Sequence, residues 1–261
     1  MYGNLLSGHL NRIMHKLFLF LYFLVRQINS FSQCIDKEKI TYGGDWRSGY
    51  VDVCPTYEFA FGGDTSKNWN VLDDPIDIAQ VAKVVMPVKN YVEQKIKSYA
   101  GETYFSRVRF NSVEIAYPED IKKFIDSGRQ DDFKKTCAAK YYFYYDFMPD
   151  SLMHYHMGIA ADANGKIISP FEFPSKAEYK PIDTKYSYCK LVDIARKVKI
   201  DLEPIKEIQF QYDDKDNRFY WLIIQEIKNE KEGLNYFYEV EIDAANLAKT
   251  KLIKAESYIE Y

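Results

Sequence analysis

Histidine is scarce in this chain of 261 residues, and the common catalytic signatures are missing. Only four histidines occur, and two of them precede residue 33. The sequence contains no Gly-x-Ser-x-Gly nucleophile elbow and no His-Glu-x-x-His helix. The glycine-rich segment at residues 62–67 lacks the residue order of a phosphate-binding P-loop. The sequence therefore gives no support to the common hydrolase and nucleotide-dependent classes of enzyme.

Apolar runs in this chain are also too short to cross a membrane. The run at residues 17–25 has nine residues, whereas a membrane-spanning helix needs about 20. Basic residues precede this run and small residues follow it, which is the order of regions in a secretory signal peptide. We expect residues 1–32 to be a signal peptide that is cleaved after Ser32, with Met1 or Met14 as its start. The competing interpretation is a buried helix of the domain.

The charge balance argues against two classes of partner. Three of the 35 basic residues and none of the 38 acidic residues fall in the expected leader, which leaves a formal charge of about −6. A mildly acidic chain without a basic cluster is a poor ligand for nucleic acid or for an anionic membrane. We expect a secreted or periplasmic protein without an integral membrane span, whose partner is a protein or peptide in the envelope or outside the cell.

All four cysteines, Cys34, Cys54, Cys137 and Cys189, lie beyond the expected cleavage site. An even number of cysteines in an exported chain predicts disulfides. Four cysteines allow three pairings. The local bond Cys34–Cys54 would close a loop of about 20 residues, contribute roughly 3 kcal/mol, and leave Cys137 to pair with Cys189. The alternative is four separate buried thiols. A four-cysteine zinc site is disfavoured because no Cys-x₂-Cys spacing is present.

The pattern after residue 74 predicts an α+β fold of two tandem units, each a helix followed by an antiparallel meander of strands. The first unit spans residues 75–173 and begins with a helix over 75–99, which Pro87 breaks or kinks. The second unit spans residues 184–261. A proline-containing linker at 174–183 joins them. The shared plan favours a duplicated unit.

Residues 33–74 have a different character and predict an irregular N-terminal extension. Glycine pairs, such as Gly43-Gly44, and Pro55 interrupt the segment. Short strands are expected at residues 50–53 and 57–61, where aromatic and β-branched residues occur. We expect the extension to pack on the units that follow it.

The second unit carries a family resemblance in its closing strand. The PepSY family has a closing segment of the form Y-x-V-x-I-D-A, and this chain matches it at Tyr238, Val240, Ile242, Asp243 and Ala244. Residues 184–258 therefore resemble a PepSY domain, and residues 75–173 resemble a weaker copy through the turn at 162–167. The resemblance implies a small secreted or envelope module, sometimes associated with peptidase inhibition in propeptides. It implies neither catalytic residues nor a cofactor.

His154 and His156 are the first candidate site. They alternate along an expected strand, so both imidazoles point to one face. Two such histidines can chelate a metal ion if a third ligand comes from elsewhere. The alternative is a pair of exposed or hydrogen-bonded histidines without a ligand.

Aromatic and acidic groups supply the other candidates. Tyr142 and Tyr144 lie on one face of the aromatic strand at 141–147 and form either a binding platform or part of the sheet packing. The aspartates of residues 213–216 predict a polar hairpin turn rather than a calcium loop, because the EF-hand glycine is missing. The alternating carboxylates at residues 239–243 fit the solvated face of a sheet.

The sequence as a whole favours a non-enzymatic module that binds a protein or peptide through an exposed sheet face or edge. It carries no resident cofactor or metal in this interpretation. The rival hypotheses are a metal-dependent hydrolase that uses His154 and His156, and a purely structural envelope protein.

Overall fold

A computed structural model describes residues 34–45, 57–62, 76–117, 139–151, 153–231 and 234–258. These residues form a mixed α+β fold with one large sheet and few helices. Among them, no helix combines the length and the hydropathy that spanning a bilayer requires. The predicted leader, the predicted strand at 50–53, Cys54 and Cys137 lie outside the described residues.

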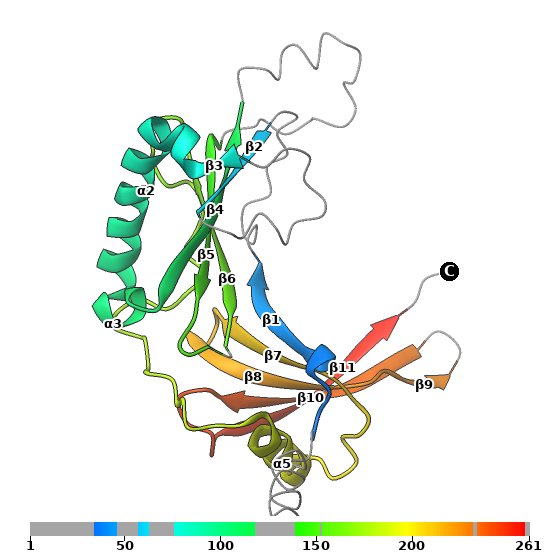
Figure 1. The fold of residues 1–261 in the computed structure, drawn as a ribbon. Helices are drawn as coiled ribbons and strands as arrows, with labels where there is room; N and C mark the ends of the chain where they lie inside the picture. The colour runs from blue at the N-terminus through cyan, green and yellow to red at the C-terminus, as the bar shows by residue number, and fades with distance from the viewer. Residues whose placement is uncertain are drawn as a thin grey trace, which may run out of the picture.

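Eleven strands make one sheet (Figure 1). They are β1 (Ile40–Asp45), β2 (Tyr57–Phe61), β3 (Ile76–Asp77), β4 (Val108–Ala116), β5 (Tyr141–Phe147), β6 (Tyr155–Ala161), β7 (Ile205–Asp213), β8 (Arg218–Gln225), β9 (Lys228–Lys231), β10 (Leu234–Asp243) and β11 (Thr250–Tyr258). Their spatial order is β11-β10-β8-β7-β1-β6-β5-β4-β2-β3, and β9 pairs with β10 outside this path. The helical elements are η1 (Lys37–Lys39), α2 (Ile78–Ala100), α3 (Glu102–Phe105) and α5 (Tyr188–Val198).

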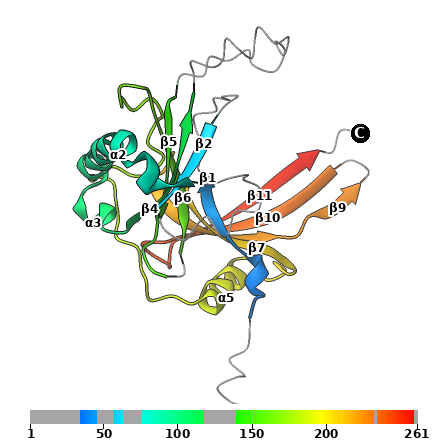
Figure 2. The ribbon, with the colours of Figure 1, turned by 45° about the horizontal axis from the view of Figure 1, so that its top comes forward.

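Helix α2 covers one face of the half-sheet that contains β4, β5 and β6 (Figures 1 and 2). The Asp77 side chain accepts a hydrogen bond from the amide of Ala79 and caps the helix, which ends at Gly101 with a positive φ of 86°. The expected break at Pro87 does not occur, because Pro87 lies inside the helix. Pro87 lacks the N–H that would bond to the carbonyl of Lys83, one turn earlier, and Lys83 is an exposed residue.

Helix α5 packs on β8, β10 and β11 of the other half-sheet. The Ser187 hydroxyl accepts a hydrogen bond from the amide of Lys190 and caps the helix, whose buried face carries Leu191, Val192 and Ala195. The predicted polar hairpin turn joins β7 to β8, with Asp213 paired to Arg218. The two half-sheets share one core, in which the rings of Phe147 on β5 and Phe219 on β8 stack 5.1 Å apart.

Strand β1 joins the half-sheets, which corrects the expectation of irregular structure for residues 40–45. Residues 40–42 pair in parallel with β7, and residues 43–45 pair in parallel with β6. Strand β2 lies in the same segment, at the predicted position 57–61. Gly43-Gly44 suggested a loop from sequence, whereas the two glycines allow a close approach of backbones inside the sheet.

Candidate functional site

The two candidate histidines meet at the junction of the half-sheets. The Tyr42 ring on β1 lies 4.5 Å from the His154 ring and 5.7 Å from the His156 ring, measured between centroids. Parallel pairing of Gly44 with His156 brings Tyr42 to this position. Tyr42 is 51% exposed. The junction is therefore an aromatic and imidazole surface that solvent reaches.

Asp146 orients His156 from the neighbouring strand β5. Asp146 Oδ1 lies 2.7 Å from His156 Nδ1, and Asp146 Oδ2 accepts a hydrogen bond from the Asn111 side-chain amide at 3.2 Å. A carboxylate at this nitrogen favours the tautomer with the proton on Nδ1 and leaves Nε2 as an acceptor. In the described part of the chain, however, no three His, Cys, Asp or Glu side chains converge as metal ligands.

The surroundings of His154 disfavour its charged form. Partial burial is the largest effect and lowers the pKa of His154, and the neighbouring His156 lowers it further, while Asp146 and Asp150 oppose this shift. Tyr186, just before α5, stands beside Asp150. Burial and the charge of that carboxylate raise the pKa of the Tyr186 hydroxyl. The junction thus combines imidazole, phenol and carboxylate groups from β1, β5, β6 and the segments beside β6 and α5.

Tyr142 and Tyr144 do not form an exposed platform. Each is only 2% exposed, and both pack with Ala139 and Ala160 in a small second core. The Tyr144 hydroxyl donates a hydrogen bond to Glu114 at 2.8 Å. Rings enclosed in this way cannot present area to a partner, so the structure supports the packing alternative for these two tyrosines.

The carboxylates of β10 are less solvated than their alternation suggested. Glu241 is 8% exposed and Asp243 is 2% exposed. Arg218 forms an ion pair with Asp243 at 2.6 Å, and Lys251 lies 3.3 Å from Glu241. These groups line a hollow of about 260 Å³ next to the start of β11. Burial, and then the charge of Glu241, raise the pKa of the adjacent Glu239.

Strand β11 forms one edge of the sheet. It pairs with β10 from Thr250 to Tyr258, and on its other side no described strand lies. Leu252 on this strand is 42% exposed, and Lys251 and Lys254 are exposed as well. An edge of this kind presents a row of backbone N–H and C=O groups that another strand can bind.

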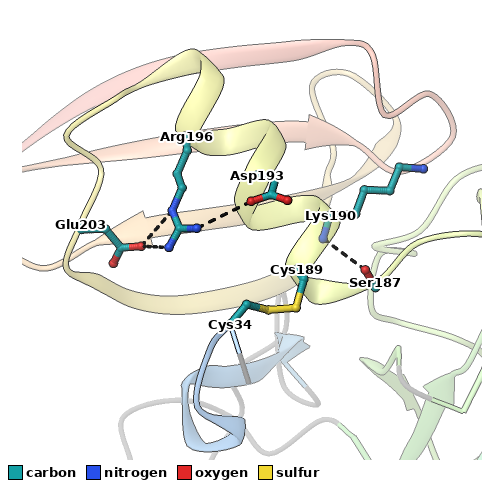
Figure 3. Close-up of a disulfide and its surroundings, with 7 residues drawn as sticks. All are labelled: Cys34, Ser187, Cys189, Lys190, Asp193, Arg196 and Glu203. Carbon is teal, nitrogen blue, oxygen red and sulfur yellow. Dashed lines mark hydrogen bonds and ion pairs between the residues drawn. A yellow bond between two sulfur atoms is a disulfide. The ribbon is translucent and has the colours of Figure 1, made fainter. Parts of the chain in front are cut away.

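A disulfide joins Cys34 to Cys189 across 155 positions. Figure 3 shows this bond connecting the segment before β1 to the first turn of α5, next to Ser187. The local Cys34–Cys54 bond considered from sequence is therefore not formed. The reason is topological, because β1 runs beside β7 and brings Cys34 to the helix that precedes β7.

Sequence reasoning missed Tyr42 and Asp146 as members of the histidine site. Asp146 was detectable, because it lies on the same face of a predicted strand as Tyr142 and Tyr144. Tyr42 was not, because its contact with His154 depends on the insertion of β1 beside β6.

The comparisons leave the function to be inferred from this geometry. No protein-family model, curated protein or solved structure matches the chain.

Proposed function

We propose that this chain is a non-catalytic module that binds a protein or peptide by taking an extended segment of its partner as an additional strand along β11. The observation that carries the proposal is the one-sided pairing of β11. This strand is nine residues long, and β10 is its only neighbour among the described strands.

The backbone of β11 supplies the affinity in this proposal. An edge strand leaves about half of its N–H and C=O groups directed outward, and an extended peptide can pair with them. This mode of recognition reads main-chain groups first and side chains second. It needs no catalytic residue, which agrees with a sequence that lacks the common catalytic motifs.

The side chains of β11 favour a foreign segment over a second β11. Lys251 and Lys254 are both exposed, and like charges that face each other across paired strands are destabilising. Leu252 lies opposite the buried Val240 and is 42% exposed. An added strand would cover this leucine, so an apolar residue at the facing position of the partner is expected.

The proposal includes export and a PepSY-like origin for both units. The order α5, β7, β8, β10 and β11 supports a helix-plus-meander unit in residues 184–258, and α2, β4, β5 and β6 support a related unit in residues 75–173. The Cys34–Cys189 bond supports an oxidising compartment. Removal of residues 1–32 as a signal peptide, and a secreted or periplasmic location, complete the proposal.

The metal-dependent hydrolase has less support than the binding module. The Asp146 contact at His156 Nδ1 leaves Nε2 as an acceptor and is compatible with metal binding, so the choice between the two functions depends on a third ligand. No third ligand joins the two histidines among the described residues. A purely structural role in the envelope predicts that no peptide binds at the β11 edge. The peptide selection described next therefore distinguishes a structural protein from a binding module.

A displayed library of extended peptides, selected against the oxidised protein, tests the proposal. Amide hydrogen exchange with the selected peptide bound should slow in β11 and leave β4 unchanged. Protection that maps to the Tyr42–His154 junction instead of β11, or a library that yields no saturable binder, would contradict the proposal.

A further inference from the structure

Strand β1 occupies a slot between strands of different half-sheets. β1 belongs to the N-terminal segment of the described chain and is parallel to both neighbouring strands, β6 and β7. No hairpin therefore joins it to either of them (Figure 1). A strand inserted in this way can leave without disrupting the antiparallel pairs β5–β6 and β7–β8 on its two sides.

Few side chains hold β1 in the slot. None of the side chains of residues 40–44 belongs to the fully buried core, and Tyr42 is half exposed. Ile35, upstream of the strand, is partly buried against the main core, and the other contacts are mainly polar. Lys39 Nζ donates to the carbonyl of Ile205 at 2.6 Å, and the Gly44 amide donates to Gln211 Oε1 at 2.7 Å. Because little apolar area is buried, withdrawal of β1 should cost much less than global unfolding.

The slot nevertheless accepts few sequences, because it leaves no space for a side chain at two positions of the inserted strand. A Cβ atom at Gly43 would overlap the carbonyl oxygen of Phe210, and one at Gly44 would overlap the carbonyl oxygen of His156. Gly44 also has a positive φ of 77°, which disfavours residues with a Cβ. Only a strand with two consecutive glycines at these positions fits, and the same segment of a second copy meets this requirement.

The Cys34–Cys189 bond is the covalent hold on the upstream end of β1. A dithiol reductant can open it by thiol–disulfide exchange. Two electrons and two protons pass to the two cysteine sulfurs, which become thiols, and the reductant becomes a disulfide. After reduction, only non-covalent contacts hold the upstream end of β1, while downstream the chain continues to β2, which pairs with β4.

We propose that β1 is an exchangeable strand. When the Cys34–Cys189 bond is reduced, β1 leaves the slot, and residues 34–45 of a second copy of this chain enter it. A disulfide oxidant such as oxidised glutathione then takes up two electrons and two protons and is reduced to two thiols, while Cys34 of one copy and Cys189 of the other form a disulfide that locks the pair. Exchange of an identical element is a low-cost route to a dimer, because each slot regains its native contacts. This inference is independent of the β11 proposal and involves a different part of the sheet.

A synthetic peptide of residues 34–45 tests the slot directly. It is mixed, in a glutathione redox buffer, with the full chain that carries Cys34→Ser and so retains an unpaired Cys189. Mass spectrometry of the digested adduct identifies the Cys34–Cys189 bond. A matched peptide with Gly43→Ala is the control, and its yield at equilibrium should be at least about tenfold lower, a ratio that corresponds to 1.4 kcal/mol. Equal yields would show that Cys189 captures any thiol and would overturn the proposal, as would no adduct with either peptide.

Two further measurements keep the test decisive if Cys34→Ser does not fold. In the wild-type chain, a dithiol reductant should speed amide exchange at residues 41–44 relative to β4, and unchanged rates would contradict the proposal. Wild-type chains reoxidised together at high concentration should form dimers that contain the Cys34–Cys189 linkage between copies. Monomers alone, at every concentration, would also contradict it.

Discussion

The Tyr144 hydroxyl donates a hydrogen bond of 2.8 Å to the carboxylate of Glu114, a residue that is only 1% exposed. A charged acceptor at this depth depends on its donors, because water cannot replace them. The relationship explains why a tyrosine, rather than a phenylalanine, occupies a position that is itself 2% exposed. It also gives the first prediction.

Replacement of Tyr144 by phenylalanine should lower the free energy of unfolding by about 1.5–3 kcal/mol, the range for a lost hydrogen bond to a charged group. Urea denaturation followed by circular dichroism measures this change. Tyr91→Phe is the control, because Tyr91 is 42% exposed on α2, and it should change stability by less than about 0.5 kcal/mol. Equal effects of the two substitutions would contradict the role assigned to the Tyr144–Glu114 pair.

Loss of the disulfide should destabilise the chain strongly. Cys34 and Cys189 are 155 positions apart, and the chain-entropy model gives about 5 kcal/mol for a loop of that order. Cys34→Ser and Cys189→Ser should therefore lower stability by similar amounts. The double variant should be no less stable than either single variant, because both substitutions remove the same bond. Denaturation of all three variants tests this, and an additive loss in the double variant would count against the pairing.

The strand predictions are confirmed where they rest on the pattern of neighbouring residues. Alternation predicted the aromatic strand at 141–147, and in β5 all residues except Asp146 are buried. The strand expected at residues 57–61 is also present, as β2. These elements are set by neighbouring residues, whose side chains decide which face meets the core.

What sequence could not give was the insertion of β1. The amide of Gly44 bonds to a side chain 167 positions away, and no local pattern encodes such a partner. The Tyr42 contact with His154 and the Cys34–Cys189 bond both depend on this insertion. The burial of Glu241 could not be predicted for a similar reason. Alternation shows which residues share a face of the sheet, but not which other residues cover that face.

His154 should make the protein sensitive to mild acid. Burial lowers the pKa of His154 in the folded state, so the unfolded state binds a proton more readily than the folded state. Stability from this group is present above the ordinary histidine pKa of about 6.5 and is lost as the pH falls from that value through the lowered folded-state pKa. His154→Gln should flatten this part of the stability profile. Denaturation midpoints between pH 5 and 8 measure the effect, and an unchanged slope in the variant would contradict it.

Glu239 should have the opposite signature. Burial and Glu241 raise the pKa of Glu239 in the folded state, so its contribution to stability is fully present below the ordinary glutamate pKa of about 4.3 and is lost as the pH rises through the folded value. Glu239→Gln should therefore be more stable than the wild-type chain at neutral pH. The gain should disappear below the ordinary glutamate pKa. A variant that is less stable at neutral pH would show that the carboxylate makes a stabilising contact instead.

The most direct test of the binding proposal is a pair of proline substitutions at adjacent positions of β11, Ile253→Pro and Lys254→Pro. Neighbouring residues of an edge strand direct their N–H groups to opposite sides, so one proline removes a bond to β10 and the other removes an outward donor. The variant that keeps the wild-type melting temperature identifies the outward position. That variant should lose binding of the selected peptide, measured by calorimetry. Undiminished binding by this stable variant would contradict strand addition at β11.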